Sequence, residues 1–176
     1  MTTIPTPVQA SVPSLATETQ STIAITASEI YPGLWLGDIT SALNIDFLRD
    51  KGITCIINCT ASLPFSQSKQ IKHRYRVSVK DNLQIDQIYR MYSLLDKAVK
   101  IIMKHLPHEK ILVHCHAGRQ RSVSVLVAFF MKCANISKED ALECIRSKRA
   151  VAGYPQFNFD KALIEYENNL RDCGFI

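Results

Sequence analysis

The 176-residue sequence lacks several features that would indicate particular protein classes. Its six cysteines include no CxxC pair and no signal peptide precedes them, so we expect free thiols in the cytoplasm or nucleus rather than a disulfide framework. The most apolar run, Val123–Met131, is much too short to cross a bilayer, so we expect no membrane span. The net charge of +5 is far below that of a dedicated nucleic-acid binder.

Residues 1–27 differ in composition from the rest of the chain. They are rich in Thr, Ser and Pro, and Glu18 is their only charged side chain. Such a segment cannot bury enough apolar surface to fold, which predicts a flexible tail. Residues 28–176 show no internal repeat and are long enough for one well-buried domain.

Short apolar segments alternate with amphipathic ones from residue 28 onward. The expected strands are two within 28–37 around the Pro32-Gly33 turn, then 53–58, about 75–79 and 111–114. The expected helices are 39–51, 86–104 with Asp86 as the N-cap, 121–132, 137–148 with Ser137 as the N-cap, and 156–171. Strands that alternate with helices predict an α/β domain with a central sheet covered on both faces.

The stretch VHCHAGRQRS, residues 113–122, joins the expected strand at 111–114 to the most apolar helix. A strand followed by a Gly-containing loop and a helix start is an arrangement that binds phosphate through backbone N–H groups and the helix N-terminus. The positive electrostatic potential of these N–H groups and of the helix N-terminus also stabilises a thiolate at Cys115. Arg121, in the first helical turn, can direct its two-pronged guanidinium at phosphate oxygens.

Two other interpretations of this stretch compete with a phosphate-binding loop. His114, Cys115 and His116 could be metal ligands, but adjacent residues at a strand end point in different directions and no second ligand pair has a usual spacing. A buried core cysteine would explain Cys115 alone. It would not explain two arginines and a glycine before an apolar helix.

Cys115-x5-Arg121-Ser122, preceded by His114 and carrying Ala117-Gly118, resembles the signature loop of the protein tyrosine phosphatase superfamily. The Leu-Trp-Leu-Gly of residues 34–37, Ile57–Thr60 and the C-terminal helix with Phe159 and Tyr166 are similar to the dual-specificity branch. The resemblance covers about residues 28–172. It implies a single-domain fold with a mainly parallel twisted sheet, and a catalytic domain over 28–176.

The resemblance also implies the roles of the loop residues. Cys115 would be the nucleophile, Arg121 the phosphate clamp, and Ser122 a hydrogen-bond donor to the cysteine sulfur. The backbone amides that would bind phosphate belong to His116, Ala117, Gly118, Arg119, Gln120 and Arg121. His114 would hold the loop and tune the thiolate, or would be only a satisfied histidine at a strand end.

The family needs a general acid upstream of the cysteine. Asp81 follows the strand expected at 75–79, whereas Asp86 is placed to cap the next helix. We therefore expect Asp81 to protonate the leaving oxygen. The resemblance implies hydrolysis of phosphotyrosine and phosphoserine/threonine in proteins through a thiophosphate intermediate, with no cofactor and no metal.

Two alternatives remain for function. Arg119 in the loop and the basic run Lys69–Arg76 would suit a phosphoinositide, another phospholipid or an RNA 5′-phosphate as substrate. A non-catalytic phosphate-binding adaptor is a third class, but it would not need Cys115 and Asp81. An RNA 5′-phosphate is the only nucleic-acid partner that these features suggest.

Three further positions are notable. Gln156 stands after Pro155 where the family usually has Asn, and Arg119-Gln120 occupy positions where small or apolar residues are commoner. Cys59 lies at the end of the strand expected at 53–58, so it is the cysteine placed to trap oxidised Cys115 as a disulfide. An unreactive core cysteine is the competing interpretation.

Overall fold

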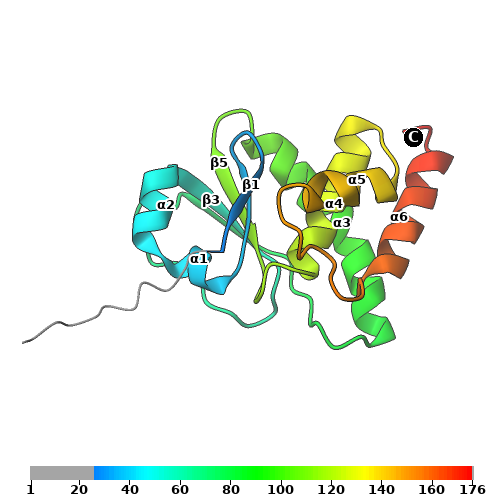
Figure 1. The fold of residues 1–176 in the computed structure, drawn as a ribbon, viewed down its shortest axis with the longest axis horizontal. Coiled ribbons are helices and arrows are strands. Elements are labelled where there is room, and N and C mark those ends of the chain that lie inside the picture. Colours follow the sequence, from blue (N-terminus) through cyan, green and yellow to red (C-terminus); the bar gives the residue numbers. More distant parts are fainter. Residues whose placement is uncertain (1–25, 176) are drawn as a thin grey trace, which may run out of the picture.

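The computed structural model describes residues 26–175 as one α/β unit (Figure 1). The strands are β1 (Ser28–Tyr31), β2 (Leu34–Gly37), β3 (Ile53–Asn58), β4 (His73–Arg76) and β5 (Lys110–His114). The helices are α1 (Ile39–Leu43), α2 (Ile45–Lys51), α3 (Ile85–His105), α4 (Arg121–Ala134), α5 (Lys138–Arg146) and α6 (Asp160–Asp172). Apart from Thr26 and Ala27, the tail expected at 1–27 lies outside the described residues.

The five strands form one mixed sheet in the order β1-β2-β5-β3-β4. β1 is antiparallel to β2, and the pairs β2–β5, β5–β3 and β3–β4 are all parallel. His114, the last residue of β5, is in register with Gly37 on one side and Asn58 on the other. The carboxyl ends of three strands therefore meet at one edge of the sheet.

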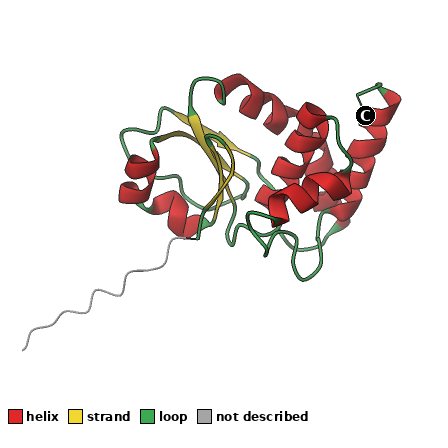
Figure 2. Ribbon diagram, turned by 45° about the horizontal axis from the view of Figure 1, so that its top comes forward, coloured by secondary structure: helices red, strands yellow, loops and turns green. Residues whose placement is uncertain are grey.

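Helices cover both faces of this sheet. In Figures 1 and 2, α1 and α2 lie against one face, α3 and α4 lie against the other, and α5 and α6 pack on the outer side of α3 and α4. Neighbouring side chains of the central strands point into opposite cores: Ile56 and Leu112 pack towards α1 and α2, whereas Ile57 and Val113 pack towards α3 to α6. Burial on both faces explains why these strands are continuously apolar, and the expected architecture is confirmed.

The expected helix at 39–51 is two helices. Asn44 ends α1 and begins α2, with its backbone extended and its side-chain oxygen accepting a 2.8 Å hydrogen bond from the Phe47 amide. An Asn side chain offers the backbone this alternative to continuous helix, so the break follows from the residue type. Gly52 ends α2 in the left-handed conformation, as expected.

Three other boundaries were wrong. β4 ends at Arg76, and the chain through Val79 is irregular. Asp86 is not an N-cap, because it lies inside the first turn of α3 while Gln84 holds the cap position. α6 begins at Asp160 rather than 156, because the Gln120 side chain forms hydrogen bonds with the backbone of residues 154, 156 and 158. Within residues 26–175, no helix is both long enough and apolar enough to span a bilayer.

Candidate active site

The loop of residues 115–120 connects the carboxyl end of β5 to the first turn of α4. Cys115 is its first residue and is almost fully buried, with 1% of its surface exposed. The Gly118 amide donates a 3.2 Å hydrogen bond to Cys115 Sγ, and Ser122 Oγ donates another of 3.3 Å. The sulfur therefore receives hydrogen bonds from both the loop and the following helix.

These contacts favour a thiolate at Cys115. Burial by itself would raise the pKa of this thiol, but the groups around the sulfur together outweigh it and lower the pKa; the largest of their contributions come from the Ser122 side chain and backbone. The positive charge of Arg121 and the amide of Arg119 act in the same direction. A thiolate is the nucleophilic form of cysteine, so the loop prepares this sulfur for attack.

A buried arginine from another element holds the outer side of the loop. Arg149 Nε donates to the Gly118 carbonyl at 2.9 Å, and its Nη2 donates to the Ala117 carbonyl at 3.3 Å. The Ile39 amide binds the His116 carbonyl at 3.1 Å. With its carbonyls engaged in this way, the loop can present amides to an anion.

Gly118 is required by this geometry. Its φ of +62° lies in the left-handed region, and a Cβ there would lie 2.6 Å from the Gly37 carbonyl oxygen. Any larger residue would push the loop away from β2. The sequence indicated the glycine, but nothing in the local pattern distinguished the buried Arg149 from the cations of the surface.

Asp81 and Arg121 face each other across the mouth of the loop. Arg121 Nε lies 3.4 Å from Asp81 Oδ2, at an ion-pair distance without good hydrogen-bond geometry. Arg121 Nη1 donates to the Val79 carbonyl at 3.4 Å, and Asn158 Nδ2 donates to Asp81 Oδ1 at 2.7 Å. The guanidinium keeps most of its donors available to an anion. The role of Asn158 was not recognised from the sequence.

Gln120 uses its side chain to fix the segment that carries Asn158. Its Nε2 donates to the carbonyls of Gln156 at 2.8 Å and Tyr154 at 3.3 Å, and its Oε1 accepts from the Asn158 amide at 2.9 Å. These hydrogen bonds engage backbone groups in the segment where a helix was expected from residue 156, and they take the place of helical hydrogen bonds there. The two departures noted in the sequence, Gln120 and Gln156, are thus in direct contact.

His114 is fully buried beneath the loop. Its Nδ1 donates to the Cys115 carbonyl at 3.1 Å, and burial lowers its pKa to about 4. The ring is therefore neutral at physiological pH, and its Nε2 is buried without a partner. It contacts the loop backbone rather than the sulfur.

A pocket of about 290 Å³ opens above the loop. Its lining residues are Asp81, Cys115, His116, Ala117, Arg119, Gln120, Arg121 and Tyr154. Asp86 is not among them, since its carboxylate accepts a 2.8 Å hydrogen bond from the neighbouring Gln87 side chain at the exposed start of α3. Between the two candidate carboxylates, only Asp81 lines the pocket that Cys115 also lines.

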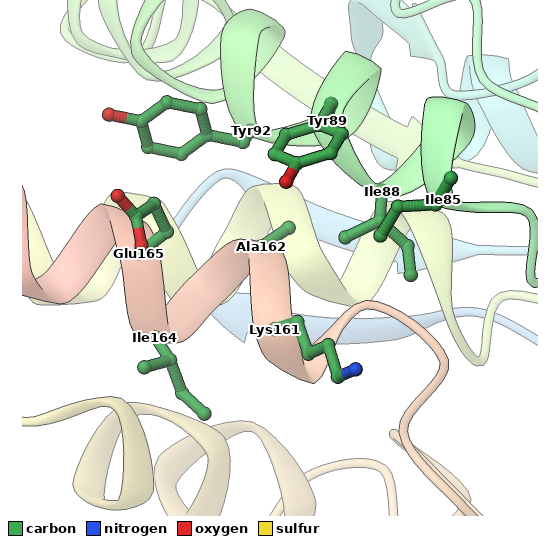
Figure 3. Close-up of a pocket in the computed structure, with 8 residues that line it drawn as sticks. All are labelled: Ile85, Ile88, Tyr89, Tyr92, Lys161, Ala162, Ile164 and Glu165. Carbon is green, nitrogen blue, oxygen red and sulfur yellow. The ribbon is translucent and has the colours of Figure 1, made fainter.

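A second hollow of about 300 Å³ lies between α3 and α6 (Figure 3). It is lined by Ile85, Ile88, Tyr89, Tyr92, Lys161, Ala162, Ile164 and Glu165. It shares no residue with the pocket above Cys115 and contains no cysteine. Its apolar walls do not suit a phosphoryl group.

Cys59 follows β3 and is fully buried. Its amide donates a 2.7 Å hydrogen bond to the His114 carbonyl, which places it beside the residue that precedes Cys115. Burial, reinforced by the nearby Cys115, raises the pKa of the Cys59 thiol well above its usual range. Cys59 is therefore protonated at neutral pH.

Comparison with known proteins matches residues 34–169 to the family model for the dual specificity phosphatase catalytic domain. Human dual specificity protein phosphatase 8 is 32% identical over 145 residues, which are 82% of this chain and 22% of that protein. Dual specificity protein phosphatase 1B of Arabidopsis thaliana is 31% identical over 147 residues, covering 82% of this chain and 83% of the relative.

Among solved structures, human DUSP28 superimposes with a TM-score of 0.73 at 26% identity, covering 82% of this chain and 95% of that one. Several of the curated relatives are much longer proteins, of which this chain spans about a fifth to a third. The likeness therefore concerns the catalytic domain. The matched region includes both the Cys115 loop and Asp81, and the chain belongs to the dual specificity phosphatase family.

Proposed function

We propose that the protein is a cysteine-dependent phosphatase that acts on phosphotyrosine and phosphoserine/threonine in proteins. The observation that carries the proposal is the Cys115 sulfur, whose pKa is lowered at the base of a pocket that also contains Arg121 and Asp81. A nucleophile, a cationic clamp and a carboxylic acid are the three groups that phosphoryl transfer through a cysteine needs.

In the first step, Cys115 Sγ would attack phosphorus in line with the leaving oxygen. An S–P bond forms, the P–O bond breaks, and protonated Asp81 gives its proton to the leaving alcohol. Arg121 and the loop amides would stabilise the equatorial oxygens, on which negative charge is concentrated.

In the second step, ionised Asp81 would take a proton from a water molecule that attacks the thiophosphate. The new P–O bond releases inorganic phosphate, and the S–P bond electrons return to Cys115. The hydrogen bond from Ser122 Oγ supports this step, because it stabilises the leaving thiolate.

A phosphoinositide, another phospholipid or an RNA 5′-phosphate is the second candidate substrate. The observation in its favour is Arg119, an exposed cation on the pocket wall. The basic run Lys69–Arg76 gives less support than its charge suggests. Arg74 donates to the carbonyls of Ser66, Ser68 and Ile71, and Arg76 donates to those of Thr60 and Leu63.

Side-by-side turnover measurements test the proposal. The panel contains phosphotyrosyl and phosphoseryl/threonyl peptides, phosphoinositide vesicles and a triphosphorylated RNA. We expect the peptides to give the highest kcat/KM. Preference for the vesicles or the RNA would transfer the assignment to the second candidate, and phosphopeptide binding without turnover would favour an adaptor.

A further inference from the structure

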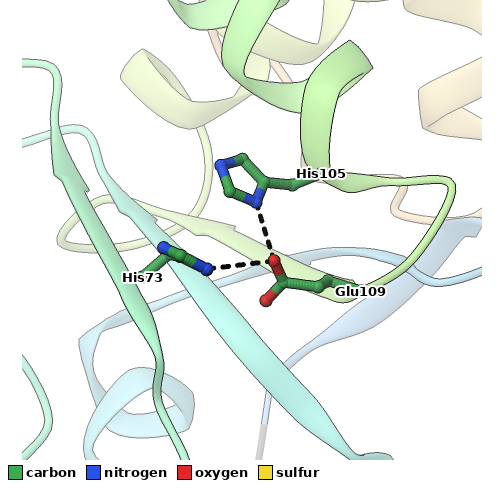
Figure 4. Close-up of side chains that lie close together, drawn as sticks. All are labelled: His73, His105 and Glu109. Atoms are coloured by element: carbon green, nitrogen blue, oxygen red, sulfur yellow. Dashed lines mark hydrogen bonds and ion pairs between the residues drawn. The ribbon is translucent and has the colours of Figure 1, made fainter.

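Two histidines and a glutamate converge at the edge of the sheet opposite the Cys115 loop (Figure 4). His73 is the first residue of β4, His105 is the last residue of α3, and Glu109 directly precedes β5. The loop at Cys115 follows the other end of β5, so the length of this five-residue strand, about 17 Å, separates the two places. The cluster is not part of the proposed phosphatase chemistry.

We propose that His73, His105 and Glu109 bind a divalent transition-metal ion, and that Zn²⁺ fits them best. Glu109 Oε1 lies 2.7 Å from His105 Nδ1 and 3.2 Å from His73 Nε2. The three ligand atoms all lie within 4.8 Å of one another. Ligand atoms around a tetrahedral zinc ion lie about 3.3 Å apart, so small side-chain rotations would complete the geometry.

Other residues hold two of the three ligands in place. The Tyr75 hydroxyl lies 2.8 Å from His105 Nε2, the ring nitrogen that would not bind the metal. Thr54 Oγ1 donates a 2.8 Å hydrogen bond to Glu109 Oε2, the oxygen that would not bind the metal. A hydroxyl can both donate and accept, so Tyr75 is compatible with His105 in either tautomer. Such outer contacts are typical of metal-binding histidines and carboxylates.

Burial and charge also suit a bound cation. The side chains of His105 and Glu109 are 6% and 13% exposed, whereas His73 is 41% exposed. An ion could therefore enter past His73 and keep a water molecule as its fourth ligand. Glu109 is the acidic member of the cluster and supplies the negative charge that a bound cation needs.

The ligand types select the class of metal. Two imidazole nitrogens and one carboxylate oxygen form a common three-ligand set for Zn²⁺, whereas Ca²⁺ and Mg²⁺ prefer oxygen ligands throughout. The sequence led us to expect no metal, because the interpretation tested there concerned only His114, Cys115 and His116. His105 and Glu109 are four positions apart, but His73 precedes them by 32 and 36 positions, so no spacing motif brings the three residues together.

A bound ion would tie the start of the edge strand β4 to α3 and to the start of the central strand β5. Its effect would therefore be on the stability of the fold rather than on turnover. Binding to the folded state alone raises the melting temperature, by about 5 to 10 °C at 100 times the Kd for a domain of this size.

The test is a titration of the full chain with zinc chloride after alkylation of its accessible thiols, which removes competing sulfur ligands. We expect one ion per chain and a higher melting temperature. His73→Ala and Glu109→Gln should each weaken binding by about tenfold or more. His108→Ala is the matched control, because it removes an exposed histidine from the same turn, and it should bind zinc as the parent does.

Imidazole ¹⁵N NMR of the unsubstituted protein provides a measurement that does not depend on how the variants fold. The ring resonances of His73 and His105 should shift on addition of zinc, while those of His108 should not. The proposal is overturned if no ion binds, if His73→Ala binds zinc as tightly as His108→Ala does, or if the two rings do not respond. Because alkylation removes Cys115 from all these measurements, they are independent of the proposed phosphatase activity.

Discussion

The side-chain amide of Asn158 donates a 2.7 Å hydrogen bond to the carboxylate of Asp81, which lies 77 positions earlier in the chain. The other oxygen of Asp81 faces Arg121 Nε at 3.4 Å, and the backbone amide of Asn158 is bound by the Gln120 side chain. The carboxylate is thus positioned from two sides. One contact is made by Arg121 itself, and the other depends on Gln120, the residue that precedes Arg121.

Asn158→Ala should slow turnover while leaving the fold intact. Loss of one hydrogen bond to a charged group should cost about tenfold in kcat/KM for substrates with poor leaving groups, because the acid is then less well placed. Aryl phosphates with good leaving groups should be affected much less. Asn169→Ala, on α6, is the control. Equal losses on both substrate types would show that Asn158 does not act through Asp81.

Cys115→Ser should abolish hydrolysis, with a loss on the order of 10⁴-fold or more, because an alcohol replaces the thiolate nucleophile. Arg121→Lys should also be severely impaired, since an ammonium group cannot form two parallel bonds to phosphate. Arg171→Lys, exposed near the end of α6, serves as the control. Initial rates on an aryl phosphate measure all three, and retained turnover in Cys115→Ser would refute the mechanism.

Asp81→Ala should reduce turnover of poor leaving groups by about 10²-fold or more, the usual contribution of a general acid. The limb of the pH profile that requires a protonated acid should also flatten. Asp86→Ala is the matched comparison, because it removes the rival carboxylate. The assignment is wrong if Asp86→Ala shows this behaviour and Asp81→Ala does not.

Ser122→Ala should move the acidic limb of kcat/KM to higher pH. The Ser122 hydroxyl lowers the pKa of Cys115 by stabilising its charged form, so removing that hydroxyl raises the pKa, and the thiolate forms only at higher pH. The rate of iodoacetamide alkylation against pH measures this directly. Ser124→Ala removes a hydroxyl that binds the Gln120 carbonyl instead, and its alkylation profile should match that of the parent.

Mild peroxide should inactivate the enzyme reversibly if Cys59 traps oxidised Cys115. The Cys115 thiolate is oxidised to a sulfenic acid, which Cys59 would attack to form a disulfide with loss of water. Because the pKa of Cys59 is raised, this second step should accelerate with increasing pH. A Cys59–Cys115 linked peptide should be visible by mass spectrometry.

Cys59→Ser should make the same inactivation irreversible, whereas Cys133→Ser, which removes an exposed thiol on α4, should leave recovery unchanged. Full recovery of Cys59→Ser with dithiothreitol would show that Cys59 is only a core residue.

The sheet could be predicted because its central strands are buried on both faces and therefore appear as continuous apolar runs. The Cys115 loop could be predicted because its chemistry lies within ten consecutive residues. The position of Asp81 followed from the alternating strand expected at about 75–79, although β4 ends at Arg76.

Other features of the site had no local signal. Arg149 reaches the Gly118 carbonyl across 31 positions, and Gln120 reaches the Asn158 amide across 38. Contacts between a side chain and a distant backbone leave no periodic pattern in the sequence. The break at Asn44 and the late start of α6 have related causes, because in each a side-chain hydrogen bond replaced helical backbone pairing.

The Arg149 guanidinium also binds the Thr26 carbonyl, at 2.8 Å and across 123 positions of sequence. The same planar group therefore joins the segment just before β1 to the loop that holds Cys115. One side chain is thus shared by two distant stretches of backbone, so a substitution that removes the Arg149 guanidinium would release both stretches together.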